Sequence, residues 1–269
     1  MILLTMKSQT IPFKSINISF TDEGKGKAVV FLHGFLEDKT IWKHFSKNLV
    51  SSTTRIITID LLGHGQTDCL SYVHTMEEMS EAVETVLKHL KIRKAYFVGH
   101  SLGGYVSLAF AEKNPDALRG LCMFHSTARA DNAEKKKDRD RAIKVVKKNK
   151  NLFINEAIPN LFNTNFKPFK REINQIKKIA NSTSLQGVVA ALEGMKVRLD
   201  REIILKFAPY PVLYIIGKYD NILPYKHLIE QAQLSEKGSY VLLENVGHAG
   251  FVEEKVLTLK AVKEFLKKN

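Results

Sequence analysis

The sequence predicts a doubly wound α/β sheet, in which strands alternate with helices that cover both faces of the sheet. Seven short apolar segments recur along the 269 residues, and helical patterns separate most of them. Most of these segments are nearly continuous apolar runs, which is typical of parallel strands buried on both faces. A hydrophobic content of 44% is enough for a sizeable core, in one large domain with an insertion or in two domains.

The expected elements follow one another along the whole chain. The first strand, residues 15–20, alternates apolar and polar residues as a half-exposed strand does. The other six strands are expected at residues 28–33, 55–60, 95–99, 120–125, 211–217 and 239–244. Helical patterns occupy residues 41–49, 76–90, 101–113, 225–233 and 256–268.

The alternation breaks once, because no strand-like segment occurs between residues 126 and 210. Four helical patterns fill this gap, at residues 131–149, 151–163, 171–182 and 185–199. We expect residues 127–205 to form a helical cap inserted into a core made of residues 1–126 and 206–269. Since the insertion leaves the carboxyl end of a strand, where ligands bind in open α/β sheets, the cap should cover a site. The alternative is helices packed elsewhere for bulk.

The formal net charge of +13 raises the question of an anionic partner. Much of the excess lies in the expected cap, where residues 133–151 alternate in sign at their start, as a solvated helix face does. This segment has no aromatic residue on which bases could stack, so we expect no nucleic-acid partner. The positive charge is then either a solvated surface or a field that steers anionic substrates.

The two cysteines, Cys69 and Cys122, do not suggest a disulfide framework, because Cys122 lies in an expected buried strand. We therefore expect a cytoplasmic protein. No segment approaches the apolar length that a membrane helix needs, so no membrane partner is expected either.

The segment Gly99-His100-Ser101-Leu102-Gly103 joins an expected strand to an expected helix. This Gly-x-Ser-x-Gly pattern at such a corner is typical of a nucleophile elbow, a tight turn that holds a serine in a strained backbone conformation. A side chain at either glycine would collide with neighbouring backbone. The alternative, Ser101 as an ordinary N-cap of the helix, does not explain two flanking glycines.

A serine hydroxyl is a weak nucleophile until a base removes its proton, and nine histidines compete for that role. In the order expected for this elbow, the base follows the serine and the acid along the chain. His125 ends a strand and His227 lies in a helical pattern, whereas His248 sits in a glycine-flanked segment after the last strand. We therefore predict His248 as the base.

An acid must orient that imidazole and stabilise its cation. Asp220 follows the strand that precedes the last one, between Ser101 and His248 in the chain, and is the predicted acid. It could otherwise cap a turn. Glu244 lies inside or at the end of the last strand, which places it less well.

Acyl transfer also needs donors for an oxyanion. We predict the backbone N–H groups of Leu102, directly after the nucleophile, and of Phe35, in the loop after the strand at 28–33. The further Gly-rich turn at residues 60–68 is expected to be scaffold, with Asp60 and His64 hydrogen-bonded within their loop.

Together these residues resemble the α/β-hydrolase superfamily over almost the whole chain. The segments HGF, DLLGHGQTD, GHSLGG, GKYDNILP and VGHAGF each match a family landmark in the expected order. The resemblance implies a mainly parallel eight-stranded sheet, a helical cap after the sixth strand, and no metal or cofactor. Within the superfamily the chain is similar to small capped carboxylesterases, enol-lactonases and carbon–carbon bond hydrolases.

At two places the sequence departs from the motifs of particular branches of the superfamily. Haloalkane dehalogenases and epoxide hydrolases of this fold carry aspartate at the elbow, so Ser101 argues against both. The chain also lacks the HGGG loop of one esterase branch and has His33-Gly34-Phe35 instead, which changes the shape of the oxyanion loop but keeps its donor.

The expected function is hydrolysis of a carboxylic ester of a small or medium acyl group through an acyl-enzyme. A lactonase, a thioesterase, a carbon–carbon bond hydrolase and a non-enzymatic receptor are the alternatives. The substrate is expected to be a small-molecule ester or lactone, bound by a monomer or homodimer. His125, Phe162 and Met195 are the expected lining of the substrate pocket, although each fits a core position as well.

Overall fold

The structure is a computed structural model that describes residues 7–268. Eight strands form a single sheet in the order β1-β2-β4-β3-β5-β6-β7-β8. The strands are β1 Gln9–Phe13, β2 Ile16–Gly24, β3 Lys27–Leu32, β4 Thr54–Ile59, β5 Ala95–His100, β6 Leu118–Phe124, β7 Val212–Gly217 and β8 Gly238–Leu243. Strands β3 to β8 run parallel to one another, and β2 pairs antiparallel with both β1 and β4. The expected eight-stranded, mainly parallel sheet is confirmed.

The apolar pattern predicts seven of these strands and misses β1. This strand has only five residues, contains Pro12 and lies at the edge of the sheet, so it carries little of the pattern that marks a buried strand. It pairs with β2 through a turn at Lys14, whose φ is 50°.

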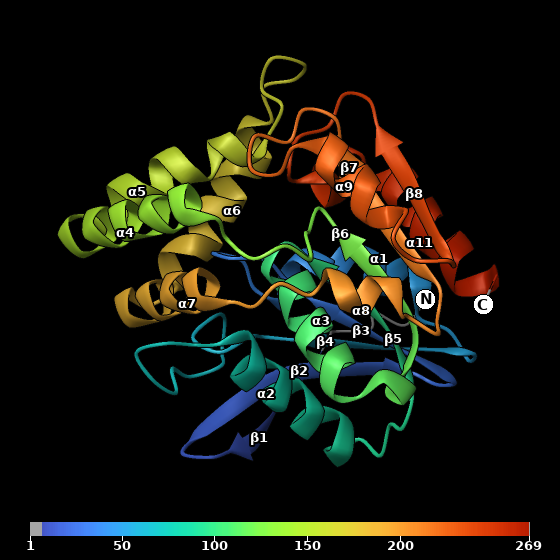
Figure 1. Cartoon of the computed structure of the whole chain (residues 1–269). Coiled ribbons are helices and arrows are strands. Elements are labelled where there is room, and N and C mark those ends of the chain that lie inside the picture. The colour runs from blue at the N-terminus through green and yellow to red at the C-terminus, as the bar shows by residue number, and fades with distance from the viewer. Residues whose placement is uncertain (1–6, 269) are drawn as a thin grey trace.

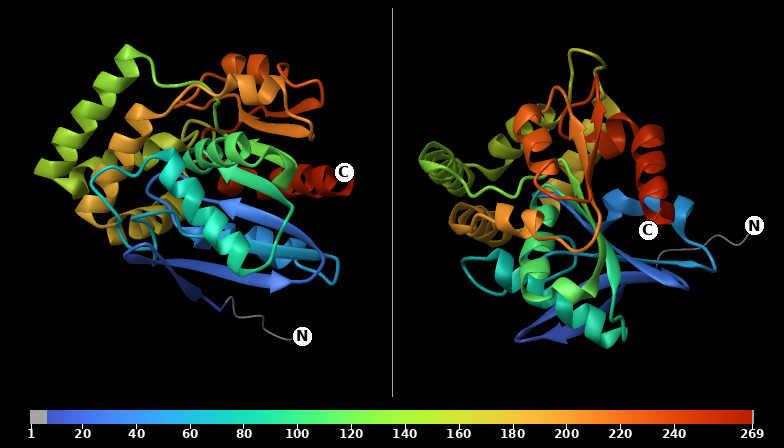
Figure 2. Two further views of the ribbon diagram at one scale, coloured as in Figure 1. Left: turned by 60° about the horizontal axis from the view of Figure 1, so that its bottom comes forward. Right: turned by 45° about the vertical axis from the view of Figure 1, so that its right-hand side comes forward.

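Helices cover both faces of the sheet (Figure 2). One face carries α1 Lys43–Leu49 and α11 Lys255–Lys268, and the other carries α2 Met76–His89, α3 Leu102–Lys113, α8 Glu202–Lys206 and α9 Tyr225–Ala232. The short elements η1 Lys39–Trp42, η2 Pro115–Ala117 and α10 Gly250–Glu253 lie in the connections. The predicted helix at 41–49 is thus a 3₁₀ turn followed by α1, and the brief α8 and α10 are not predicted by any pattern.

The chain leaves the carboxyl end of β6 and enters a group of helices that stands apart from the sheet layers, at the left of Figure 1. These are α4 Ala133–Lys148, α5 Lys150–Ala157, η3 Pro159–Leu161, α6 Lys170–Ser182 and α7 Leu185–Val197. The pattern at 151–163 predicts one helix, but α5 ends at Ala157 because Pro159 cannot donate the next helical hydrogen bond. The next helix, α8, packs against α3 and α9.

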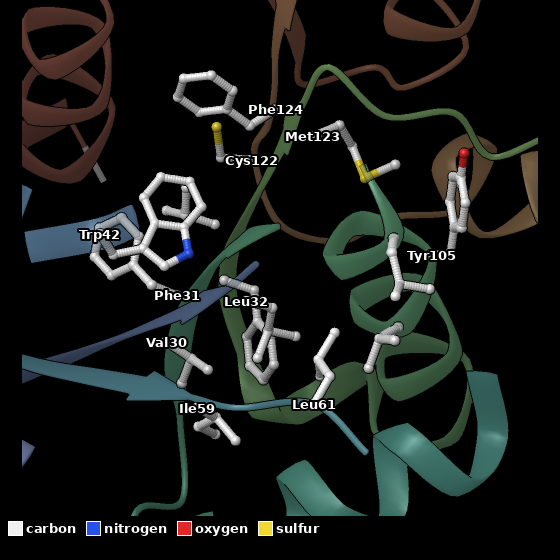
Figure 3. Packing of buried hydrophobic residues seen from close by; sticks show 14 of the residues in the cluster. Val30, Phe31, Leu32, Trp42, Ile59, Leu61, Tyr105, Cys122, Met123 and Phe124 are labelled. Atoms are coloured by element: carbon white, nitrogen blue, oxygen red, sulfur yellow. The ribbon is translucent and has the colours of Figure 1, made fainter. Parts of the chain in front are cut away.

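The core lies on both faces of the central strands (Figure 3). Trp42 packs against Phe31 and Phe124, with ring centroids 5.0 Å and 5.8 Å apart. Cys122 is fully buried next to them, and burial raises the pKa of its thiol, so this cysteine is part of the core. Neither Cys69 nor Cys122 forms a disulfide. None of the helices within residues 7–268 is both long and apolar enough to cross a membrane.

Candidate active site

Ser101 stands at the corner between β5 and α3 with φ 48° and ψ −111°. A non-glycine residue in such a conformation costs about 1–3 kcal/mol, so the surrounding structure must hold it there. Its neighbours allow the turn: a Cβ on Gly103 would lie 2.4 Å from the Leu32 carbonyl oxygen, and one on Gly99 would lie 2.5 Å from the Gly103 oxygen. The expected collisions at both glycines are confirmed.

The strained turn is tied to the neighbouring strand, β6. The Ser101 N–H donates to the Phe124 carbonyl at 3.0 Å, and the Ser126 hydroxyl donates to the Ser101 carbonyl at 2.7 Å. A Cβ on Gly104 would occupy the place of this Ser126 side chain. The hydroxyl of Ser101 itself makes no hydrogen bond to any residue in the range 7–268 and lines a cavity.

His248 and Asp220 are brought together by the loops after β8 and β7. His248 Nδ1 donates to Asp220 Oδ2 at 2.7 Å, and both side chains are buried. The other carboxylate oxygen of Asp220 accepts the N–H groups of Ile222 and Leu223 at 2.8 Å and 3.0 Å. Burial alone would raise the pKa of the Asp220 carboxyl, but the attraction and hydrogen bond of His248 lower it, so the group is a carboxylate.

The imidazole ring of His248 and the hydroxyl of Ser101 line the same cavity, without a hydrogen bond between them in the described structure. In proteins without substrate such catalytic hydrogen bonds are often long and tighten on binding. The structure therefore places the predicted nucleophile and base in the wall of one cavity, and the predicted acid is hydrogen-bonded to the base.

Two further groups hold the loop of His248, and the sequence gives no sign of either. The Leu161 carbonyl, in η3, accepts the N–H groups of His248 and Ala249 at 2.7 Å and 3.0 Å. The Glu253 carboxylate accepts the N–H groups of Gly247 and Ala249, and also that of Asn163. The position of His248 thus depends on the inserted helical segment.

A buried pair, Glu37 and His100, lines the same cavity as Ser101, and the sequence does not predict it. Glu37 Oε2 accepts His100 Nδ1–H at 2.9 Å and the Gly34 N–H at 2.6 Å. The other ring nitrogen of His100, Nε2, donates to the His248 carbonyl at 2.9 Å. The pair therefore joins the loop after β3, the residue before the nucleophile and the loop of His248.

The predicted oxyanion donors are free to donate hydrogen bonds to an anion. Neither the Phe35 N–H nor the Leu102 N–H has an acceptor among the described residues. Leu102 is the first residue of α3, where the helix dipole adds positive potential. Phe35 lines the cavity together with Ser101.

Of the three residues expected to line the pocket, only Met195 does so. His125 is fully buried beside the cavity: its Nδ1 accepts the Gly217 N–H at 3.1 Å and lies 3.7 Å from Asp220 Oδ2. Burial lowers its pKa well below the ordinary value, so the ring is neutral. Phe162 packs against Phe169 with centroids 5.5 Å apart. Which side chains of the inserted helices face the cavity depends on helix packing, which the helical pattern alone does not define.

Asp60 and His64, in the loop after β4, are hydrogen-bonded: His64 within that loop, and Asp60 both within it and to Lys39 in η1. Asp60 accepts the Lys39 ammonium and the Gln66 N–H, and His64 Nδ1 donates to the Leu62 carbonyl at 3.0 Å. Burial lowers the pKa of His64 to about 3, so this ring is neutral as well.

The cavity itself has a volume of about 230 Å³ and a mostly apolar wall. Besides the residues above, this wall consists of Leu36, Tyr105, Ala142, Phe153, Ala157, Ile158, Asn160, Leu161, Leu192 and Ile222, with Lys135, Asp138 and Arg139 from α4. Within residues 7–268, no three His, Cys, Asp or Glu side chains are grouped so that they could hold a metal ion.

Comparisons with known proteins agree with this architecture. A family model described as alpha/beta hydrolase fold matches residues 27–255. A thermophilic esterase from Thermogutta terrifontis, solved with malate bound, is 31% identical with a TM-score of 0.90, over 97% of this chain and 98% of that one. The enol-lactonase from Burkholderia xenovorans LB400 is similar in fold, with a TM-score of 0.88 at 21% identity over 96% and 100% of the two chains. The pimeloyl-[acyl-carrier protein] methyl ester esterase of Wigglesworthia glossinidia brevipalpis is 26% identical over 89% of this chain and 93% of its own.

Proposed function

Because the chain belongs to the alpha/beta hydrolase family, we propose that it is a serine hydrolase that cleaves a carboxylic ester of a small or medium acyl group. Ser101 is the nucleophile, His248 the base and Asp220 the acid that orients it. Residues 127–205 serve as a cap over a core of residues 1–126 and 206–269. The esterase from Thermogutta terrifontis supports the choice of an ester, since it is similar over nearly the whole chain.

One observation carries this proposal. His248, which is hydrogen-bonded to Asp220 at 2.7 Å, lines the same cavity as Ser101, which the strained turn holds in the cavity wall. A serine held as a plain helix cap would not need that strain. A histidine with a purely structural role would not need a buried carboxylate at Nδ1 and a place in the wall of a cavity.

In the first half of the reaction the Ser101 oxygen bonds to the ester carbonyl carbon while His248 Nε2 takes the hydroxyl proton. The carbonyl oxygen becomes an oxyanion, which the Phe35 and Leu102 N–H groups stabilise. Asp220 stabilises the imidazolium that forms. The bond to the alcohol oxygen then breaks, the alcohol leaves with the proton from His248, and the acyl group remains on Ser101.

Water completes the cycle. His248 takes a proton from a water molecule as the water oxygen bonds to the acyl carbon, and a second tetrahedral intermediate forms in the same oxyanion site. The bond to the Ser101 oxygen breaks, His248 returns the proton to that oxygen, and the carboxylic acid leaves. The apolar wall and the cavity volume of about 230 Å³ suit a small or medium acyl chain.

The test is a series of initial rates on p-nitrophenyl esters from acetate to laurate, with Ser101→Ala as the matched variant. We expect turnover with a chain-length optimum, and a loss of several powers of ten in kcat in the variant, with the fold intact. If no ester is hydrolysed while Ser101 still reacts with a fluorophosphonate, the bond cleaved is a different one, such as a lactone, a thioester or a carbon–carbon bond. Failure of that reaction as well would contradict an enzymatic role for Ser101.

A further inference from the structure

We propose that Lys135 and Arg139 form a carboxylate-binding subsite in the cap wall of the cavity, so that the preferred substrates are esters that carry a free carboxylate. This inference rests on the proposed function, because it names the substrate class of the same cavity. It comes from three charged residues of α4 that line a cavity with a mostly apolar wall.

Their spacing places these side chains on one face of α4. Lys135, Asp138, Arg139 and Ala142 all line the cavity, and they stand at positions i, i+3, i+4 and i+7 of the helix. Residues with this spacing share one face of a helix. The intervening Lys136, Lys137 and Arg141 are exposed, so α4 turns one pair of cations inward while its other cations face solvent.

The Lys135 ammonium has no carboxylate partner among the described residues. Its side chain makes no hydrogen bond or ion pair there, and Asp138, the acid at i+3 on the same face of α4, pairs with Arg141. Lys135 also lies in the first turn of α4, where the helix dipole disfavours a cation. Its position therefore brings no evident gain in stability, which favours a role in binding.

Arg139 shares its carboxylate partner, Asp131, with Arg198. Its Nε donates to Asp131 Oδ2 at 2.9 Å, but Asp131 Oδ1 is also 2.7 Å from Nη1 of Arg198. Two arginines thus share one acid, and the two Nη atoms of Arg139 have no acceptor in the range 7–268. The bond to Asp131 fixes the guanidinium and leaves its outer donors for a ligand.

The charges that line the cavity therefore do not cancel. Asp138 with Arg141 is neutral as a pair, and so is Glu37 with His100. Lys135 contributes one positive charge, and Arg139 with Arg198 and Asp131 contributes another. Cations that are partly withdrawn from water and left unpaired favour an anion strongly, and a planar guanidinium beside an ammonium suits a carboxylate.

The substrate that fits has two ends. Its ester lies at Ser101, its carboxylate lies at α4, and an apolar chain between them contacts the apolar wall of the cavity. Hemi-esters of dicarboxylic acids have this form when the acyl part reaches α4. Acetate esters of ω-hydroxy acids have it when the alcohol part does.

The experiment compares kcat/KM at pH 7 for methyl hydrogen adipate, dimethyl adipate and 6-acetoxyhexanoate, measured by acid release. We expect one of the two anionic esters to exceed the neutral diester by about tenfold or more, the effect of one hydrogen bond between charged groups. Lys135→Met should remove about this factor for the anionic ester and change the diester rate much less. Lys136→Met, which removes the same charge from the exposed face, should change neither rate. Arg139→Lys should lower the anionic rate more than the diester rate.

Equal rates on all three esters, or an equal loss on anionic and neutral esters in Lys135→Met, would overturn the subsite. If none of the esters is hydrolysed, the proposed function fails but the subsite is still tested by binding. In that case methyl hydrogen adipate should raise the melting temperature of the wild type and of Lys136→Met more than dimethyl adipate does, and should lose this advantage in Lys135→Met. A shift that is the same in all three proteins would overturn it.

Discussion

Glu37 and His100 form a buried ion pair that spans the candidate active site. Both side chains are 1% exposed, and a 2.9 Å hydrogen bond joins Glu37 Oε2 to His100 Nδ1. Since His100 Nε2 donates to the His248 carbonyl, both ring nitrogens carry protons and the ring is an imidazolium. Burial alone would raise the pKa of Glu37 and lower that of His100, but their mutual attraction reverses both directions. The pair fixes the loops that bear Phe35 and His248 relative to Ser101.

We expect Glu37→Gln to lower kcat by about tenfold to a hundredfold with a smaller change in KM, because it displaces groups that act on the transition state. Breaking one partner of a buried pair should also cost about 3–5 kcal/mol of stability. Kinetics at a temperature where the variant is folded separates the two effects. Gly34→Ala is the matched second variant, since its Cβ would lie 2.6 Å from His100 Nδ1 and 2.7 Å from Glu37 Oε2. If the two losses in kcat simply multiply in the double variant, they do not act through one pair.

The same pair should make stability depend on pH. The pKa of His100 is raised above 6.5, so its contribution is complete below pH 6.5 and is lost as pH rises through the folded-state pKa. The pKa of Glu37 is lowered below 4.5, so its contribution is complete above pH 4.5 and is lost as pH falls through the folded-state pKa. Urea unfolding of the wild type and His100→Gln from pH 5.5 to 9 should show the difference in unfolding free energy shrinking above pH 6.5. A difference that is constant with pH would mean that His100 is neutral in the fold.

Much of the fold and the main candidate site residues could be predicted because their signals are local. The elbow is marked by Gly99 and Gly103, and each acts within a few residues of Ser101. Asp220 and His248 follow strand ends, and the carboxyl ends of neighbouring parallel strands meet at one edge of the sheet. The apolar runs identify the central strands for the same reason, because a strand buried on both faces has apolar residues at nearly every position.

The contacts that join distant segments could not be predicted. Glu37 and His100 are 63 positions apart, and neither lies in a pattern that names the other as its partner. The inward face of α4 is a further example: its alternating charges predict a solvated helix, and only packing turns Lys135 and Arg139 to the cavity. The same lack of helix orientation explains why Phe162 was expected in the pocket and lies beside it.

Gly247 provides a test of the coupling between the inserted helical segment and His248. A Cβ at this position would lie 2.8 Å from the Leu161 carbonyl oxygen and 2.9 Å from the Asn163 nitrogen, which are backbone atoms and cannot turn aside. We expect Gly247→Ala to push the His248 loop away from this segment and to lower kcat about tenfold or more. Gly238→Ala is the control, because its Cβ meets the Ala232 carbonyl far from the cavity. It should lower stability and leave kcat of the folded protein unchanged. Equal kcat in both variants would show that the position of His248 does not depend on the inserted helical segment.

Asp220→Asn tests the acid most directly, because it keeps the shape of the side chain. Asn Oδ1 can still accept the N–H groups of Ile222 and Leu223, so we expect the fold to remain intact. The Asn amide, however, donates where the carboxylate accepts, so His248 Nδ1 must become the acceptor and Nε2 must carry the proton. A protonated Nε2 cannot take the proton of Ser101, and kcat should fall by about 10³–10⁴.

The measurement for this variant is the initial rate on the best p-nitrophenyl ester, with Asp116→Asn as an isosteric control on the exposed surface. Circular dichroism and the melting temperature establish that both variants are folded before their rates are compared. The control should keep the wild-type kcat. Because a wrong tautomer impairs the proton transfer and leaves substrate binding intact, the loss in Asp220→Asn should be in kcat and not in KM. Wild-type kcat in a folded Asp220→Asn would show that another carboxylate orients His248.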